Sequence, residues 1–299
     1  MFKKQPLRSE QDSAWKDVLD VCFKEFMEFF YFDISNKIDW LVPYVTLDNE
    51  LQAITTDAMI GKRFVDKLVK VKSLAGQEEV VLIHIEVQGQ KEEEFSKRLF
   101  QYYCKLFTRY DQSILTLAIL TDSNQSWHPQ HYHREVFGFS VLNFNFQTHK
   151  LLEYRNTKQE LEESNNPFAT VILAHLACTE TKRNPEARFQ MKFKLTRRLY
   201  EKGYSRDYVI NLYKVIDWVL SLPAELALEY RNKIHKLEEA KNVSYISSIE
   251  QLGREEGLQQ GRHEEDLAIA KRMLGMGADR DFIKKATGLS DQDLLNLED

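Results

Sequence analysis

The stretches Arg63–Val71 (RFVDKLVKV) and Val80–Gln88 (VVLIHIEVQ) decide the fold of this 299-residue chain. Both are rich in valine, the second also in isoleucine, and the turn-forming segment Ala75–Glu78 (AGQE) separates them. Branched residues of this kind favour β-strands, so the two stretches are predicted to form an antiparallel hairpin. A few polar side chains interrupt the apolar pattern, and these are the first candidates for a functional site.

Periodicity in the flanking sequence predicts helices around this hairpin. Apolar residues recur at helical spacing in Ser13–Phe32 and again in Phe95–Tyr110. Ile114–Leu120 is almost wholly apolar, as in a strand buried on both faces, and Val141–Phe146 alternates large apolar residues with asparagine. The order helix, hairpin, helix, strand, strand predicts an α/β core, a mixed sheet flanked by helices, over residues 1–150.

The remainder of the chain has a helical pattern. The predicted segments are Phe168–Thr179, Glu186–Lys202, Asp207–Leu220 and Glu225–Ala240. They form a helical extension, residues 151–247, that is expected to pack on the core. Residues 248–299 follow as a charged helix with Gly253, Gly257 and Gly261 at four-residue spacing, and then as a helical hairpin at Ala268–Leu297.

The spaced glycines leave two interpretations of residues 248–299 open. Glycine in a helix costs about 1 kcal/mol relative to alanine. Close helix–helix approach, for instance in a homodimer, would offset that cost, and a loosely packed connector would not need to. This tail is therefore a candidate segment for oligomerisation or for binding a partner.

Composition bounds the classes of function. The net charge of -5 and the pI of about 6.0 exclude a globally basic DNA-binding surface, although not a local basic patch. Three scattered cysteines without ligand spacing indicate a reducing compartment. No apolar run approaches the roughly 18 residues that cross a bilayer, so we expect a cytoplasmic protein without a membrane contact.

The polar residues of the predicted hairpin suggest a metal site. Alternation along the second strand places Glu86 and Gln88 on one face, and a hairpin can bring Asp66 close to Glu86. Two neighbouring carboxylates repel each other unless a cation or a proton lies between them. Oxygen ligands suit Mg²⁺ (or Mn²⁺), and such an ion can activate water against a phosphodiester. An amphipathic hairpin with solvated carboxylates explains the same pattern equally well.

Several segments resemble one known family. Gly61–Val71 followed by Ile83–Gln88 is similar to the Rpn family of recombination-promoting nucleases, also described as transposases, within the PD-(D/E)XK nuclease superfamily. The segments Arg98–Tyr103, Asn166–Ala169 and Thr287–Ser290 match it as well, so the resemblance runs along nearly the whole chain. It implies a PD-(D/E)XK restriction-endonuclease-like core that cuts DNA with Mg²⁺, followed by an α-helical C-terminal region.

The resemblance also implies roles for individual residues. Asp66 and Glu86 match the metal-binding carboxylates of the superfamily, and Gln88 stands where the superfamily usually has lysine. Glutamine carries no charge, so it can orient water but cannot stabilise the developing phosphorane electrostatically. The Rpn-like subgroup itself has glutamine at this position. Lys70, on the Asp66 face, or Lys67, on a twisted strand, are candidates to supply the missing positive charge.

Further residues are secondary candidates for the site. Glu25 or Glu28 on the first helix could complete the metal shell as a third carboxylate, and a solvated face explains them as well. Arg98, Gln101 and Tyr102 lie within one helical turn of each other and are candidates to contact the DNA backbone, because arginine and amide groups position phosphates. Core packing explains Tyr102 equally well.

Two other motifs are set aside. The cluster Trp127–His133 holds three histidines, but it lacks cysteine and helical histidine spacing, which favours loop histidines over a zinc site. The terminal hairpin Ala268–Leu297 has the outline of a helix-turn-helix, but its several aspartates favour contact with a partner over groove reading.

Three hypotheses for the function follow. The leading one is Mg²⁺-dependent endonucleolytic cleavage of DNA that promotes recombination. The second is a nuclease fold without turnover that acts as a binding module, motivated by Gln88 in the place of lysine. The third is transposase-like strand transfer, for which the hairpin offers two well-placed acids instead of three.

Overall fold

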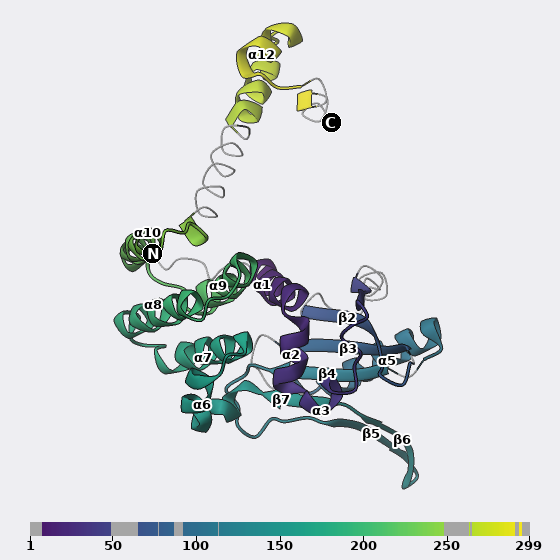
Figure 1. Ribbon diagram of the computed structural model, residues 1–299. Helices are drawn as coiled ribbons and strands as arrows, with labels where there is room; N and C mark the ends of the chain where they lie inside the picture. Colours follow the sequence, from purple (N-terminus) through teal and green to yellow (C-terminus); the bar gives the residue numbers. More distant parts are fainter. Residues whose placement is uncertain are drawn as a thin grey trace. The chain divides into compact units, whose positions relative to one another are not determined.

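The computed structural model describes residues 8–48, 65–76, 78–86, 92–112, 114–247, 263, 265–290 and 293–294. The chain divides into two compact units, Met1–Asn232 and Lys233–Asp299. The first unit is a mixed sheet with helices on both faces, as expected for an α/β core (Figure 1). Among the described residues, no helix combines the length and the apolar character needed to span a membrane.

The main sheet has the described strand order β1-β2-β3-β4-β7. These strands are β1 (Val45–Thr46), β2 (Val65–Lys72), β3 (Glu78–Glu86), β4 (Ile114–Leu120) and β7 (Gln147–Lys150). The pairs β1–β2 and β2–β3 are antiparallel, whereas β3–β4 and β4–β7 are parallel. The predicted hairpin is therefore confirmed over the described parts of both strands. The predicted central strand at Ile114–Leu120 is also confirmed, with five of its side chains fully or almost fully buried.

One face of the sheet is covered by N-terminal helices. The predicted single helix at Ser13–Phe32 is wrong in one respect, because it is three helices: α1 (Arg8–Val21), α2 (Phe23–Phe30) and α3 (Phe32–Ser35). The breaks fall at Cys22 and Tyr31, where φ is -120° and -134°. The second break lets the Tyr31 hydroxyl reach over the sheet and donate to the Ala118 carbonyl at 3.1 Å.

The other face is covered by α5 (Phe95–Tyr110), whose bounds agree with the prediction. Its buried side chains form a core with side chains from β2, β4 and the segments that follow β4. This core contains Leu68, Phe95, Leu99, Tyr102, Leu106, Ala118, Leu120, Trp127, Phe144 and Phe146, among others. Leu68, Ala118 and Leu120 therefore mark the α5 face of the sheet.

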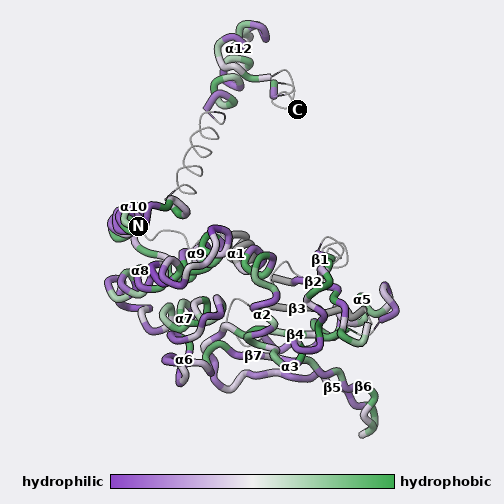
Figure 2. The backbone as a smooth tube through the Cα atoms, viewed as in Figure 1, coloured by the Kyte–Doolittle hydropathy of each residue, from purple (hydrophilic) through white to green (hydrophobic). Residues whose placement is uncertain are grey.

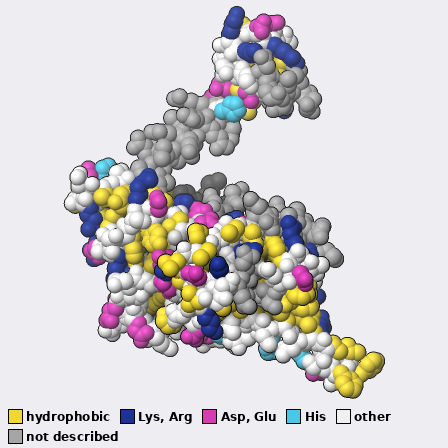
Figure 3. All heavy atoms as spheres, turned by 45° about the vertical axis from the view of Figure 1, so that its right-hand side comes forward, with side chains coloured by type: hydrophobic (Ala, Val, Ile, Leu, Met, Phe, Trp, Pro, Cys, Tyr) yellow, Lys and Arg dark blue, Asp and Glu magenta, His cyan; other side chains and the backbone are white. Residues whose placement is uncertain are grey.

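The strand predicted at Val141–Phe146 does not join the main sheet. It is β6 (Phe139–Asn145), which pairs only with β5 (His131–Val136) among the described strands, in a separate two-stranded ribbon. The ribbon extends beyond the rest of the unit, and hydrophobic side chains gather at its tip (Figures 1, 2 and 3). The expected loop histidines are thus partly strand residues, His131 and His133.

The remaining helices of the first unit pack beside the sheet. They are η1 (Leu151–Thr157), α6 (Lys158–Glu163), α7 (Pro167–Glu180), α8 (Pro185–Glu201), α9 (Arg206–Val219) and the start of α10 (Ala224–Lys241). The α7 side chain Phe168 meets Trp15 of α1 and Phe26 of α2, with ring centroids 6.5 and 5.3 Å apart. The predicted helices were correct here, whereas η1 and α6 were not foreseen.

The second unit contains a small helical domain. A helix at 265–275 is followed by α12 (Arg280–Thr287), and Gly277 with φ +78° lies in the turn between them. The predicted turn after Thr287 is confirmed by Gly288 at φ +72°. The break at Gly277 was not predicted. The three spaced glycines of the predicted charged helix, Gly253, Gly257 and Gly261, lie outside the described residues.

Candidate functional site

The backbone register brings the two predicted metal ligands to one face of the sheet. Asp66 pairs with His84 across the antiparallel ladder, and Glu86 lies two residues farther along β3. Residues that pair across a ladder, and those two apart on a strand, lie on the same face. This is the α5 face, because Leu68 of the core is two residues from Asp66. The side chains of Asp66 and Glu86, and the whole of Gln88, lie outside the described part of the structure.

The carboxyl ends of the three parallel strands β3, β4 and β7 lie at the same edge of the sheet as Glu86. Glu86 pairs with Leu120, and Leu120 pairs with Lys150, so the last residues of β3, β4 and β7 lie at one level. In α/β sheets, ligands commonly bind outside the carboxyl ends of the parallel strands. Asp66, near the amino end of the antiparallel β2, reaches the same edge.

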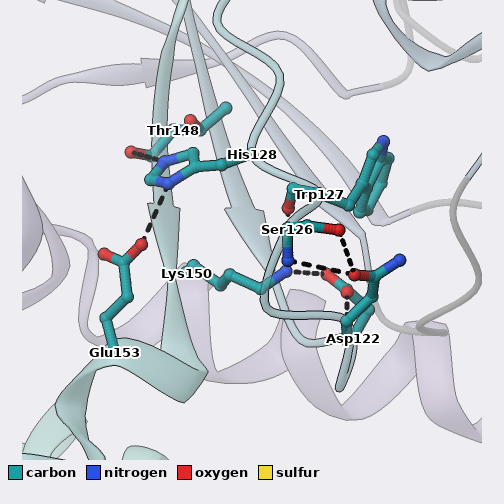
Figure 4. A network of polar contacts seen from close by, with 8 residues as sticks. Asp122, Ser126, Trp127, His128, Thr148, Lys150 and Glu153 are labelled. Atoms are coloured by element: carbon teal, nitrogen blue, oxygen red, sulfur yellow. Dashed lines mark hydrogen bonds and ion pairs between the residues drawn. The ribbon is translucent and has the colours of Figure 1, made fainter.

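A buried ion pair lies at this edge, and sequence reasoning missed it (Figure 4). The Lys150 ammonium donates to Asp122 Oδ2 at 2.5 Å and to the Trp127 carbonyl at 2.9 Å. Both charged side chains are at most 1% exposed. The Asp122 Oδ1 atom also accepts from the backbone N–H of Asn124 at 2.8 Å. The only signal in the sequence was an aspartate two residues after an apolar strand.

Lys67 and Lys70 lie in different environments. Lys67 points away from the α5 face: its fully buried ammonium contacts Asp20 of α1 and also Asp48, the latter at 3.3 Å. The expectation that Lys67 could serve the Asp66 site is therefore wrong, because its charge is engaged on the opposite face. Lys70 is on the Asp66 face but pairs with Val80, four residues farther along β2. The structure places it away from the edge that holds Glu86.

Glu25 and Glu28 lie on α2, which covers the face opposite α5. The Glu25 carboxylate accepts from the Tyr208 hydroxyl at 2.6 Å. Burial, together with this hydrogen bond, raises the pKa of Tyr208. Glu28 lies 3.7 Å from the Lys24 ammonium. The structure does not bring either glutamate to the face of Asp66 and Glu86, so neither completes that site.

The three candidates on α5 do not form one exposed surface. Tyr102 is 2% exposed within the core, so it does not contact DNA from this position. Arg98 is 8% exposed, its guanidinium contacts Glu92, and it lies over the Phe95 ring at 5.6 Å. Gln101 is exposed and remains available to a ligand. Arg98, Gln101 and Tyr102 lie within one helical turn, but α5 packs against the sheet so that Arg98 and Tyr102 are buried and only Gln101 is exposed.

Ligand clusters can be assessed only for the described side chains. Within that part of the chain, no three histidine, cysteine, aspartate or glutamate side chains group closely enough to hold a metal ion. A metal site built on Asp66 and Glu86 therefore depends on their strand positions and on the chemistry of their carboxylates.

The terminal domain has a small hydrophobic core of its own and a side-chain cap at the start of each helical turn that follows. Its core contains Ala270, Ile283, Leu289 and Leu294. The Asp279 carboxylate caps α12 by accepting from the backbone N–H groups of Asp281 and Phe282 at 2.9 and 3.3 Å. The Ser290 hydroxyl caps the next turn, accepting from Asp293 N at 3.2 Å, as the sequence predicted. Two helices joined by a short turn around a small core have the connectivity expected of a helix-turn-helix domain.

Comparison with known families agrees with this assignment. Residues 263–299 match the family model described as the Rpn/YhgA-like nuclease family, C-terminal HTH domain. The match supports membership of the Rpn family and describes this segment as a helix-turn-helix domain, whereas the aspartates favoured contact with a partner. Two of those aspartates lie at helix N-termini: Asp279 is the N-cap of α12, and the Asp293 carboxylate accepts from the backbone N–H and the hydroxyl of Ser290. No curated protein and no solved structure matches the chain.

Proposed function

We propose that this chain is a Mg²⁺-dependent DNA endonuclease with a PD-(D/E)XK-like core that promotes recombination. The observation that carries the proposal is the register of β2 and β3, which puts Asp66 and Glu86 on one face at the edge where the parallel strands end. The match of residues 263–299 to a domain named for a nuclease family supports the same class of activity.

The electrostatics of the sheet favour a cation from solution at this position. Lys67 is engaged by Asp20 and Asp48, and Lys150 is engaged by Asp122. Each of these two buried lysines thus has a carboxylate partner of its own within the chain. Two carboxylates on neighbouring strands repel each other, and a hard divalent cation with oxygen ligands removes that repulsion.

Each residue has a distinct task in the proposed site. Asp66 and Glu86 would hold Mg²⁺ or Mn²⁺ through their carboxylate oxygens, and the bound ion supplies Lewis-acid activation of water and phosphate. Gln88 would orient the attacking water through its amide, because an amide is uncharged and cannot act as a base at neutral pH. DNA would lie outside the sheet edge, and Gln101, which is exposed on α5, is a candidate to contact its backbone.

Cleavage of supercoiled plasmid DNA tests the proposal. The full chain should nick the plasmid with Mg²⁺ and not with EDTA, and Asp66→Ala and Glu86→Ala should each abolish nicking. Glu79→Ala is the matched control, because Glu79 pairs with Val71 at the far end of the hairpin and lies on the opposite face. Equal nicking by the wild type and by both site variants would refute the assignment.

A second candidate is a nuclease fold that binds DNA without turnover. The observation that favours it is Gln88, which removes the positive charge that related sites use to stabilise the phosphorane. A chain that binds duplex DNA tightly but neither nicks it nor binds divalent cations would support this candidate. Joining of DNA strands, instead of simple nicking, would support strand transfer.

A further inference from the structure

Arg98 of α5 has a guanidinium that is almost completely buried and fixed by its neighbours. The side chain is 9% exposed, contacts the Glu92 carboxylate and lies over the Phe95 ring, with Cζ 5.6 Å from the ring centroid. The planar fork of an arginine can bind a carboxylate or a phosphate through two parallel hydrogen bonds. The Glu92 carboxylate therefore marks an anion-binding position at the first turn of α5.

This anion position lies at the edge of the sheet where the carboxyl ends of β3, β4 and β7 meet. The Phe95 ring is 5.3 Å from the Trp127 ring, and the Lys150 ammonium is 5.6 Å from the same Trp127 ring. Lys150 lies two strands from Glu86 at the same level of the sheet, a separation of about 10 Å. The first turn of α5 thus covers the face and the edge to which Asp66 and Glu86 belong.

Arg98 differs from the two buried lysines in the exposure of its partner. Lys150 is paired with Asp122, whose side chain is fully buried, so an anion from solution does not reach that ion pair. Lys67 faces α1 and not α5. The Glu92 side chain is 33% exposed, so the ion pair of Arg98 is open to solvent on its carboxylate side. A partly exposed ion pair is weak enough for a second anion to displace its carboxylate.

We propose that Arg98 binds a DNA backbone phosphate at the site of cleavage, and that Glu92 is a latch that occupies the guanidinium until DNA displaces it. The proposal rests on the proposed function, because it takes DNA as the ligand and Asp66 and Glu86 as the neighbouring site. Gln88 brings no positive charge to that site. A guanidinium on the phosphate would stabilise the negative charge that develops on its oxygens during cleavage.

Two variants with opposite expected effects distinguish this latch from a purely structural ion pair. Arg98→Met removes the cation, whereas Glu92→Gln keeps the size of the competing side chain and removes its charge. A structural ion pair would lose stability in both variants and would change DNA binding in neither. If Arg98→Met does not fold, Glu92→Gln and Arg98→Lys decide the question. Lys97→Met is the matched control, because Lys97 is paired with Glu94 at 2.6 Å in the same helical turn.

Binding is measured on the full chain in EDTA, by fluorescence anisotropy with a labelled duplex at several salt concentrations. Arg98→Met should weaken binding about tenfold and reduce the slope of log Kd against log salt by about 0.9, because one phosphate contact is lost. Glu92→Gln should tighten binding, because the phosphate no longer competes with a carboxylate. Lys97→Met should keep the wild-type affinity and slope.

Nicking of plasmid DNA with Mg²⁺ is the second measurement. Arg98→Met should lower the rate at saturating DNA about a hundredfold, in the range for loss of one charge-stabilising donor, and should leave Mn²⁺ binding unchanged. Arg98→Lys keeps the charge but not the bidentate fork, so it should keep the salt slope and recover part of the rate. An unchanged salt slope in Arg98→Met, or weaker DNA binding in Glu92→Gln, would overturn the proposal.

Three outcomes separate this proposal from the proposed function. If the wild type binds DNA with a slope that depends on Arg98 but never nicks it, the phosphate contact stands and the endonuclease function falls. If the wild type nicks through Asp66 and Glu86 while Arg98→Met behaves as the wild type, the endonuclease function stands and the phosphate contact is refuted. A wild-type chain that neither binds nor nicks DNA refutes both.

Discussion

The two faces of the main sheet each bury a lysine beside carboxylates, but the carboxylates on the two faces differ in their exposure to solvent. On the α1 face, Lys67 is fully buried, whereas its partners Asp20 and Asp48 are 44% and 12% exposed. On the α5 face, the side chains of Lys150 and Asp122 are both almost completely buried. The comparison shows that each of these two buried lysines has a carboxylate partner of its own within the chain.

The largest effect on stability is expected from breaking the buried ion pair between Lys150 and Asp122. Lys150→Met leaves the Asp122 carboxylate buried without its cation, which should cost about 3–5 kcal/mol of the free energy of unfolding. Lys67→Met should cost less, about 1–2 kcal/mol, because Asp20 stays partly solvated. Urea denaturation of both variants measures the difference.

Two controls make this comparison sharper. Lys158→Met removes an exposed pair with Glu180 and should cost less than about 1 kcal/mol. The double variant Lys150→Met, Asp122→Leu should regain most of the stability, because an apolar pair of similar volume replaces the charges. A greater loss in Lys67→Met than in Lys150→Met would contradict the difference between the two faces.

A smaller effect is expected from pH on the helical layer behind the α1 face. His175 of α7 lies 5.5 Å from the Trp15 ring and 6.0 Å from the Trp218 ring, and burial lowers the pKa of its imidazole to about 4. The unfolded chain binds the proton near the ordinary pKa of about 6.5. The stability is therefore fully present above pH 6.5 and decreases as the pH falls towards 4.

The His175→Phe variant tests this pH dependence. It should keep the ring packing and lose part of the decrease in unfolding free energy between neutral and acidic pH. His235→Gln is the control for the loss of a histidine at an exposed position, since that side chain is 65% exposed. An identical profile in wild type and His175→Phe would show that other groups, such as the half-buried His149, carry the whole dependence.

The smallest effect is expected outside the sheet, in the terminal domain. Asp279→Ala removes the cap of α12 and should destabilise that helix by about 1 kcal/mol. Asp281→Ala, in the same helical turn but without the capping bonds, should have a weaker effect. Hydrogen exchange of the amides in 280–287 measures both. Equal protection in the two variants would contradict the assigned cap.

The sequence was sufficient for the elements that have a clear period. The hairpin, α5 and β4 were predicted because alternation and helical spacing are strong there. The hairpin allowed Asp66 to lie near Glu86, and the register, which no sequence pattern fixes, puts the two positions on one face. The strand β7 was missed, because Gln147–Lys150 is polar and pairs with β4 only through the tertiary fold. Propensity does not reveal a strand whose lysine is buried by a distant partner.

The remaining parts of the site depended on contacts that no local pattern encodes. Lys150 and Asp122 are 28 residues apart, and their ion pair forms only when β7 lies beside β4. Lys67 shows the reverse case: it is next to Asp66 in the sequence, but the fold places its side chain on the other face of the sheet. Because side chains alternate along a strand, Lys67 and Asp66 are expected on opposite faces. The twist of the strand is not large enough to bring the Lys67 ammonium to the Asp66 face.

Calorimetric titration of the full chain with Mn²⁺ tests the central claim most directly, because it measures the shared cation independently of any cleavage. The wild type and Glu79→Ala should bind the ion, whereas Asp66→Ala and Glu86→Ala should each lose that binding. Unchanged binding in both site variants, or no binding in the wild type, would contradict a metal centre at the edge of β2 and β3.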